Sequence, residues 1–224
     1  WPPEVMMRKT RWMILGTVLL LAVLGAGRGQ AQTPDPFHIY LPLIHRPLPP
    51  PAALAAVADA YVAENDPGGN TGHLPYLLAG YDEDPETMEG TVRSLIRFDL
   101  SGLESHVIES ATLRVYYAGF SDYEDMARLI EVFAADGPWQ ETEVTWLNQP
   151  SMAEPYGSIS ILANKQYGYR EIDVTTLVEA WVDGSVANHG IYLVGPEVSG
   201  SDYSYRVFGA RETAYPPQLV IVFN

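Results

Sequence analysis

The stretch ATLRVYY, residues 111–117, alternates between apolar and polar side chains. Its odd-numbered side chains are apolar or aromatic and share one face of an extended chain: Ala111, Leu113, Val115 and Tyr117. The even-numbered side chains, from Thr112 to Tyr116, fall on the opposite face. This alternation is typical of a strand that buries one face and exposes the other. We therefore predict a half-buried β-strand at this position.

Nine further runs have strand length and are rich in β-branched or aromatic residues. They are VADAYVA (57–63), LPYLLAG (74–80), RSLIRFDL (93–100), RLIEVFAA (128–135), TEVTW (142–146), YREIDV (169–174), GIYLVG (190–195), YSYRVFGA (203–210) and QLVIVF (218–223). Turn-forming residues separate them. About ten strands at this spacing predict an all-β fold, namely an antiparallel jelly-roll β-sandwich.

One segment, DVTTLVEAWVDG (173–184), has helical spacing instead. Asp173 suits the N-cap and Gly184 lies where a C-cap is expected. An apolar stripe runs between them, made of Val174, Leu177, Val178 and Trp181. We expect one short helix that closes an end of the sandwich.

The N-terminal part looks like an export signal over residues 1–31, with Met7 as the expected start. Basic residues precede the apolar run Trp12–Leu24, and small residues precede a cleavage point after Ala31. An uncleaved anchor is the alternative. Residues 32–56 are rich in proline and predict an extended linker. Residues 57–224 then form one domain, which we expect to be secreted to the extracellular space or the cell surface, with no membrane span after cleavage.

Charge and cysteine content narrow the possible functions. Of 13 basic and 28 acidic residues in the chain, five and two precede Pro47, which leaves 8 against 26 and a net charge of about −18. Such a surface disfavours nucleic acid and anionic lipid. The chain has no cysteine, so lipoprotein anchoring, disulfides and thiol catalysis are excluded.

The stretch WQETEVTWLNQP (139–150) allows three interpretations. Glu141 and Glu143 could be a catalytic pair, its two tryptophans could stack on sugars, or the run could be a structural edge strand. Glycosidase carboxylates normally come from different elements that flank a cleft. We therefore favour the strand, with Val144 and Trp146 pointing inward and both glutamates outward. No nucleophile elbow, phosphate loop or histidine metal motif is present either, so we predict a protein that is not an enzyme.

Acidic loops and loop aromatics are the candidates for binding. Calcium prefers several oxygen ligands, so a structural Ca²⁺ is a possible cofactor, and the candidate ligands are Asp82, Asp84, Asp122 and Asp125. Aromatic rings can stack on sugars, and loops present side chains that cores hide, which favours Tyr81, Phe120, Tyr123 and Tyr203. Tyrosines on the expected strands, among them Tyr76, Tyr116 and Tyr205, are the alternative stacking surface.

Several segments together resemble the extracellular DNRLRE domain, which is related to carbohydrate-binding module family 96 and the disaggregatase-related repeats. In chain order they are ADAYVAENDPGGNTG (58–72), RSLIRFDLS (93–101), SATLRVYY (110–117), WQETEVTWLNQP (139–150), IDVTTLVEAWVDG (172–184) with NHGIYL (188–193), and VFGARE (207–212) with PPQLVIVF (216–223). The resemblance implies a jelly-roll sandwich with a binding or surface-structural role. It also implies structural positions, where arginine–carboxylate pairs hold strands together: Arg97, Asp99, Arg211 and Glu212. The tryptophans Trp139, Trp146 and Trp181 are expected to pack in the core or at its rim.

The residues and the resemblance together favour a secreted, non-catalytic module that binds a polysaccharide or cell-surface glycan, or that is structural at the cell surface. Characterised relatives bind acidic polysaccharides such as alginate through basic residues. The excess of acidic residues here favours a neutral glycan or a protein surface instead. An adhesion or matrix protein with a protein partner is the first alternative, and a glycoside hydrolase or lyase is a distant one.

Overall fold

The computed structural model describes residues 50–82, 89–103, 106–121, 126–197 and 205–224. The expected signal at 1–31 and most of the expected linker lie outside these ranges, as do the following candidate site residues: Asp84, Asp122, Tyr123, Asp125 and Tyr203. No helix within the described ranges is long and apolar enough to cross a membrane.

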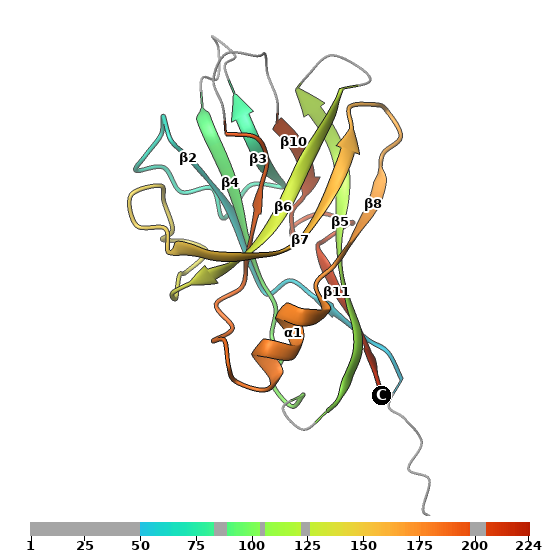
Figure 1. Ribbon diagram of the computed structural model, residues 1–224. Helices are drawn as coiled ribbons and strands as arrows, with labels where there is room; N and C mark the ends of the chain where they lie inside the picture. The colour runs from blue at the N-terminus through green and yellow to red at the C-terminus, as the bar shows by residue number, and fades with distance from the viewer. Residues whose placement is uncertain (1–49, 83–88, 104–105, 122–125, 198–204) are drawn as a thin grey trace, which may run out of the picture. The chain divides into compact units, whose positions relative to one another are not determined.

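The described chain forms eleven strands and one helix (Figure 1). In order they are β1 (Ala52–Ala55), β2 (Ala58–Ala63), β3 (Tyr76–Asp82), β4 (Gly90–Arg97), β5 (Ile108–Ser121), β6 (Ala127–Asp136), β7 (Ser151–Leu162), β8 (Gly168–Asp173), α1 (Thr175–Val182), β9 (Ile191–Val194), β10 (Tyr205–Gly209) and β11 (Gln218–Phe223). Neighbouring strands pair antiparallel throughout. The predicted all-β sandwich with one short helix is confirmed.

The strands form two layers that share β3. Sheet A contains β1, β11, β5, β8 and β10, and sheet B contains β2, β4, β9, β6 and β7. The first half of β3 pairs with β10 in sheet A, and its second half, from Gly80, pairs with β4 in sheet B. Gly80 has φ 136°, a conformation that favours glycine, and it lies where the strand passes between the layers.

The main core lies between the sheets, and the predicted face of β5 forms its centre. Ala111, Leu113, Val115 and Tyr117 are all fully buried there. The helix α1 adds Leu177, Val178 and Trp181 to this core. Asp173 accepts hydrogen bonds from the Thr175 backbone N–H (2.9 Å) and hydroxyl (2.6 Å) before the first turn, and Gly184 follows the helix with φ 79°. The helix is therefore bounded as its sequence indicates, with the formal cap one residue later at Val174.

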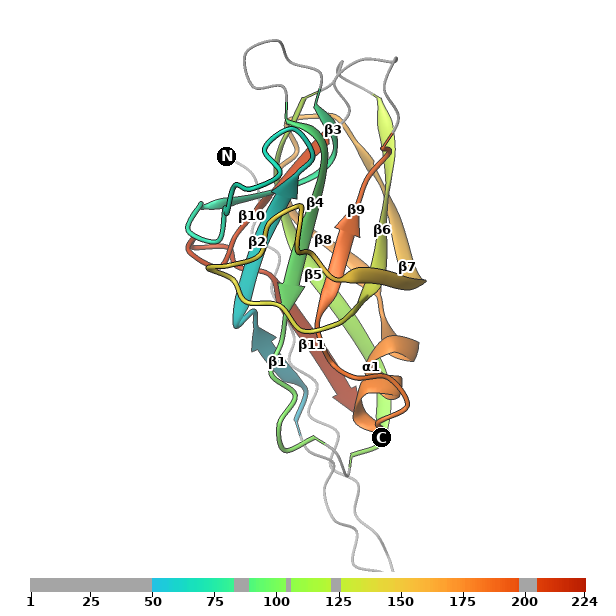
Figure 2. The same ribbon diagram turned by 90° about the vertical axis from the view of Figure 1, so that its left-hand side faces the viewer.

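The predicted strand at TEVTW (142–146) is wrong. Residues 139–150 are a series of turns, in which the backbone N–H groups of Glu143 and Val144 both donate to the Gln140 carbonyl. This segment crosses the outer side of sheet B (Figure 2) and closes a second core there, made of Ala58, Ala60, Val62, Leu95, Ala135, Trp139, Val144, Tyr192 and Val194. Val144 is buried as expected, whereas Trp146 is only half-buried.

Two strands are present where none was expected. Strand β1 lies within residues 32–56 and pairs with β11, so the sheet begins before the expected end of the linker. Strand β7 contains Pro155, a residue type that is rare inside strands. It pairs with β6 alone, and the register shifts on both sides of the Phe133–Pro155 pair. An edge strand with a bulge tolerates proline because no ladder hydrogen bond is required from it.

Candidate functional site

The outer face of sheet A, on the side away from the core, carries a group of tyrosines that we call the tyrosine face: Tyr76, Tyr116, Tyr169, Tyr205 and Tyr215. On β5, the side chains that alternate with the buried ones point to this face, and Tyr116 is paired with Tyr169 of β8. On the other side of β5, Gly209 of β10 is paired with Tyr76 of β3. Strand alternation therefore brings tyrosines from separate parts of the chain onto one surface.

A depression of about 260 Å³ lies at the β3–β10 end of this face. It is lined by Tyr76, Leu78, Asp82, Glu89, Tyr205 and Val207. Leu78 and Val207 are directly paired across β3 and β10, and both pack in a small hydrophobic cluster. The depression thus combines an apolar base, two phenol rings and two carboxyl groups.

The ring of Tyr76 is held in place by a second ring. Tyr61 on β2 stacks against it, with centroids 5.8 Å apart and planes inclined by 26°. Tyr61 is 3% exposed, whereas Tyr76 is 36% exposed. The Tyr61 hydroxyl donates to Glu89 Oε1 at 3.0 Å. One side of the Tyr76 ring is therefore packed, and the rest remains accessible to a ligand.

The two carboxyl groups of the depression are largely shielded from water. Asp82 is buried and its Oδ2 accepts the Glu89 backbone N–H at 3.5 Å. Glu89 Oε2 is buried without a hydrogen-bond partner among the described residues. Burial raises the pKa of the Glu89 carboxyl, the Tyr61 hydrogen bond opposes that rise, and the charge of Asp82 adds to it. Both residues line the depression, and carboxyl oxygens accept hydrogen bonds from hydroxyl groups.

Of the four aromatic residues expected to bind ligand, Tyr81 and Phe120 lie within the described ranges. Tyr81 is half-buried on β3 and does not line the depression. Phe120 packs against the core between the sheets. The depression instead uses Tyr76 and Tyr205, which belong to the strand-borne alternative. The alternation of side chains along β3 and β10 indicates these two tyrosines, because it places Tyr76 on the same face as Leu78 and Tyr205 on the same face as Val207.

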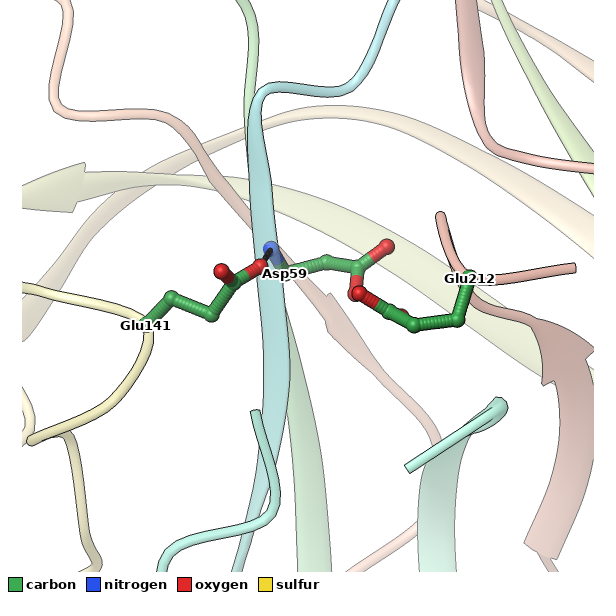
Figure 3. A group of neighbouring side chains, drawn as sticks. All are labelled: Asp59, Glu141 and Glu212. Atoms are coloured by element: carbon green, nitrogen blue, oxygen red, sulfur yellow. Dashed lines mark hydrogen bonds between the residues drawn. The ribbon is translucent and has the colours of Figure 1, made fainter. Parts of the chain in front are cut away.

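A second group of interest contains three carboxylates from different parts of the chain: Asp59, Glu141 and Glu212 (Figure 3). Oxygens from the three lie within 4.8 Å of one another, an arrangement that could hold a cation. Arg211 already occupies it, because its Nε and Nη2 donate to Glu141 Oε1 (2.5 Å) and Oε2 (3.0 Å). Arg211 Nε also lies 3.2 Å from Glu212. The guanidinium therefore supplies the positive charge that a metal would bring.

Asp59 connects this group to the edge of sheet B. Its backbone N–H donates to Glu141 Oε1 at 2.9 Å, and its side chain accepts the Arg211 backbone N–H at 2.8 Å. Burial raises the pKa of Asp59 to about 7, and the charges of Glu212 and Glu141 add to the rise. Both Glu141 oxygens are thus hydrogen-bonded, so the expectation that this side chain faces outward is wrong. Glu143 is exposed, as expected. The cluster connects the segments 58–72, 139–150 and 207–212 by hydrogen bonds, so we interpret it as structural.

Of the four remaining structural candidates, Arg97, Trp146 and Trp181 contact or belong to the segment 139–150 or the core, whereas Asp99 is exposed. Arg97 donates to the Trp139 carbonyl at 3.0 Å and lies over its ring, and it pairs with no carboxylate among the described residues. Asp99 accepts the Ser101 backbone N–H. The Arg93 guanidinium lies 4.6 Å from the Trp146 ring centroid, and Trp181 packs in the main core.

A family model described as carbohydrate-binding module family 96 matches residues 50–223, a range that includes every described strand. The comparison with curated proteins gave no match.

Proposed function

Because the chain belongs to carbohydrate-binding module family 96, we propose that it binds a neutral polysaccharide and that the depression beside Tyr76 and Tyr205 is the binding site. The observation that carries this proposal is the combination found there. A tyrosine ring is accessible on one side and braced on the other, and it lies beside buried carboxyl oxygens. Sugar rings require an apolar surface for their C–H groups and acceptors for their hydroxyls, and the depression supplies both.

Charge supports a neutral ligand. From Pro47 onward the chain has 8 basic and 26 acidic residues, and the described residues that line the depression include two acids and no base. A carboxylated sugar would meet like charges in a poorly hydrated place, which is costly. A neutral sugar would instead offer hydroxyl donors to Asp82 and Glu89.

The proposal includes export and a non-catalytic role. Residues 1–31 have the pattern of an export signal. The carboxylate pair that could suggest hydrolysis is not arranged for it, since Glu141 is bound by Arg211 and by the Asp59 backbone while Glu143 is exposed to solvent. A general acid must donate a proton to the substrate and must reach it. Both oxygens of Glu141 are already bound by protein donors.

Affinity electrophoresis through soluble xylan, galactomannan, mixed-linkage β-glucan and alginate tests the binding. The chain is expressed with residues 1–31, and the exported form is collected. We expect retardation by at least one neutral polysaccharide, none by alginate, and no release of reducing sugar. Tyr76→Ala should reduce affinity about tenfold, as expected for loss of one aromatic anchor.

Tyr167→Ala is the matched control, because Tyr167 is also an exposed tyrosine but lies in the turn before β8. Both variants should have the same melting temperature as the unmodified chain. Binding that survives Tyr76→Ala would place the site elsewhere. Retention on no glycan would favour a protein partner, and sugar release would overturn the non-catalytic role.

A further inference from the structure

Tyr215, in the loop between β10 and β11, is a second exposed tyrosine that is braced by another ring. It stacks on Tyr116 with centroids 4.3 Å apart and planes inclined by only 13°. Tyr116 in turn meets Tyr169 edge-on, at 5.5 Å and 87°. Tyr215 is nevertheless 50% exposed. One face of its ring is therefore covered by Tyr116, and the ring still presents a large surface to solvent.

The loop that carries Tyr215 is held by hydrogen bonds. The Tyr169 hydroxyl donates to the Pro216 carbonyl at 3.1 Å. The Thr213 hydroxyl donates to the Ala210 carbonyl at 2.7 Å and accepts the Tyr215 backbone N–H at 3.1 Å. The exposed ring is thus positioned before any ligand arrives, which lowers the entropy lost on binding.

Tyr215 lies close to the depression because of Gly209. Gly209 is paired with Tyr76 in the β3–β10 ladder. A Cβ atom on Gly209 would lie 2.9 Å from the Tyr215 carbonyl oxygen and 3.6 Å from Tyr116 Cβ. The loop therefore rests on the glycine that separates Tyr76 from Tyr116. Adjacent strands are about 4.8 Å apart, so Tyr76 on β3 and Tyr116 on β5, with β10 between them, lie roughly 10 Å apart across the strands.

The face continues beyond Tyr116 with polar side chains. Arg114 donates to Glu171 Oε1 at 3.1 Å and to Gln218 Oε1 at 2.8 Å, so one row of side chains is linked across three strands. A depression of about 290 Å³ lies beside it and is lined by Thr112, Arg114, Glu171 and Val220. The charge of Arg114 is compensated by Glu171, so this end offers hydrogen-bonding groups without a free cation for an acidic sugar.

We infer that Tyr215 is a second sugar-stacking subsite and that the ligand is an extended neutral polysaccharide chain lying across β3, β10 and β5. The chain enters the depression at Tyr76 and Tyr205, crosses over Tyr215, and continues toward Arg114 and Glu171. This inference rests on the proposed function and adds to it the length and direction of the ligand. The competing role for the ring stack is purely structural, as an anchor of the loop over Gly209.

Oligosaccharide length separates these roles. Isothermal titration of the exported chain uses the disaccharide and the hexasaccharide of the xylo-, manno- and cello-series. We expect the hexasaccharide of the recognised series to bind more tightly than its disaccharide. Tyr215→Ala should weaken hexasaccharide binding about tenfold and leave disaccharide binding unchanged, because a short ligand uses the depression alone. Tyr76→Ala should weaken both.

Two further variants identify the cause. Tyr215→Phe keeps the ring and should bind the hexasaccharide like the unmodified chain, and Tyr167→Ala controls for loss of an exposed tyrosine elsewhere. Equal affinity of the unmodified chain for the two lengths, or an unchanged hexasaccharide affinity in Tyr215→Ala, would overturn the extended site while leaving the depression in place. Failure of the unmodified chain to bind any of these sugars would overturn the proposed function itself.

Discussion

Glu141 is a side chain whose role depends entirely on its neighbours. It accepts the Asp59 backbone N–H and both donors of Arg211, and it thereby satisfies an N–H on the outer edge of β2. Glu141→Ala would leave that buried N–H without an acceptor, which should lower the free energy of unfolding by about 1–3 kcal/mol.

Urea unfolding at neutral pH measures the effect, and Glu143→Ala is the control. Glu143 lies two residues along the same turn but is exposed, so its loss should change stability by less than about 0.5 kcal/mol. Equal effects from the two substitutions would show that the link to Asp59 and Arg211 contributes nothing.

Asp59 should make stability depend on pH. Burial raises its pKa to about 7 in the folded chain, above the ordinary value of 3.8. Between these values the folded chain keeps a proton that the unfolded chain has lost. Stability should therefore fall as pH rises from about 4 to about 7, by up to about 4 kcal/mol, and remain level above that.

Asp59→Asn removes this ionisation while its amide oxygen can still accept the Arg211 N–H. As pH rises across the same range, the unfolding free energy of the variant should increase relative to that of the unmodified chain. Parallel curves would contradict a raised pKa. The difference is the quantity to compare, because subtraction removes the contribution of the other acidic groups that both proteins share.

At the scale of elements, the link between α1 and β9 depends on a close approach of backbones. Gly190 has φ 91°, and a Cβ there would lie 2.4 Å from the Ile96 carbonyl oxygen of β4. Gly190→Ala should therefore be strongly destabilising, because the left-handed conformation costs about 1–2 kcal/mol and overpacking adds about 1–3 kcal/mol.

Gly102→Ala provides the matched control. Gly102 has φ 87°, but a Cβ at that position would meet no atom of the described residues within 4 Å. Thermal or urea unfolding should show only the conformational cost of about 1–2 kcal/mol for this variant. The excess in Gly190→Ala then measures the contact with β4, and no excess would mean that the loop moves freely aside.

At the scale of the whole molecule, the salt dependence of binding reports whether the ligand of this acidic protein is charged. An uncharged ligand held by ring stacking and hydrogen bonds makes no ion pairs with the protein. Its affinity should remain unchanged between low salt and about 1 M salt, where the screening length falls to about 3 Å. Affinity electrophoresis at the two salt concentrations checks this, and a marked change of affinity in either direction would show that the ligand is charged.

The parts of the fold that were predicted correctly are those whose side chains repeat regularly. Strand β5 and helix α1 bury the faces that their periodicity indicated, because one side of each must leave water. The prediction was wrong for 142–146, where a short alternating run forms turns that cover sheet B. It also missed β1 and β7, whose partners β11 and β6 supply the pairing that their own composition does not indicate.

The sequence by itself determined the strand texture, the helix, the acidic balance and the resemblance to a family of carbohydrate-binding modules, since each is a property of residue order and composition. Only the tertiary structure decided which aromatics share a surface. Tyr61 and Tyr76, or Tyr116 and Tyr215, become neighbours through strand pairing and loop packing between distant segments. The same holds for Asp59, Glu141 and Arg211, because long-range register brings their oxygens and nitrogens within hydrogen-bonding distance and no local pattern records that register.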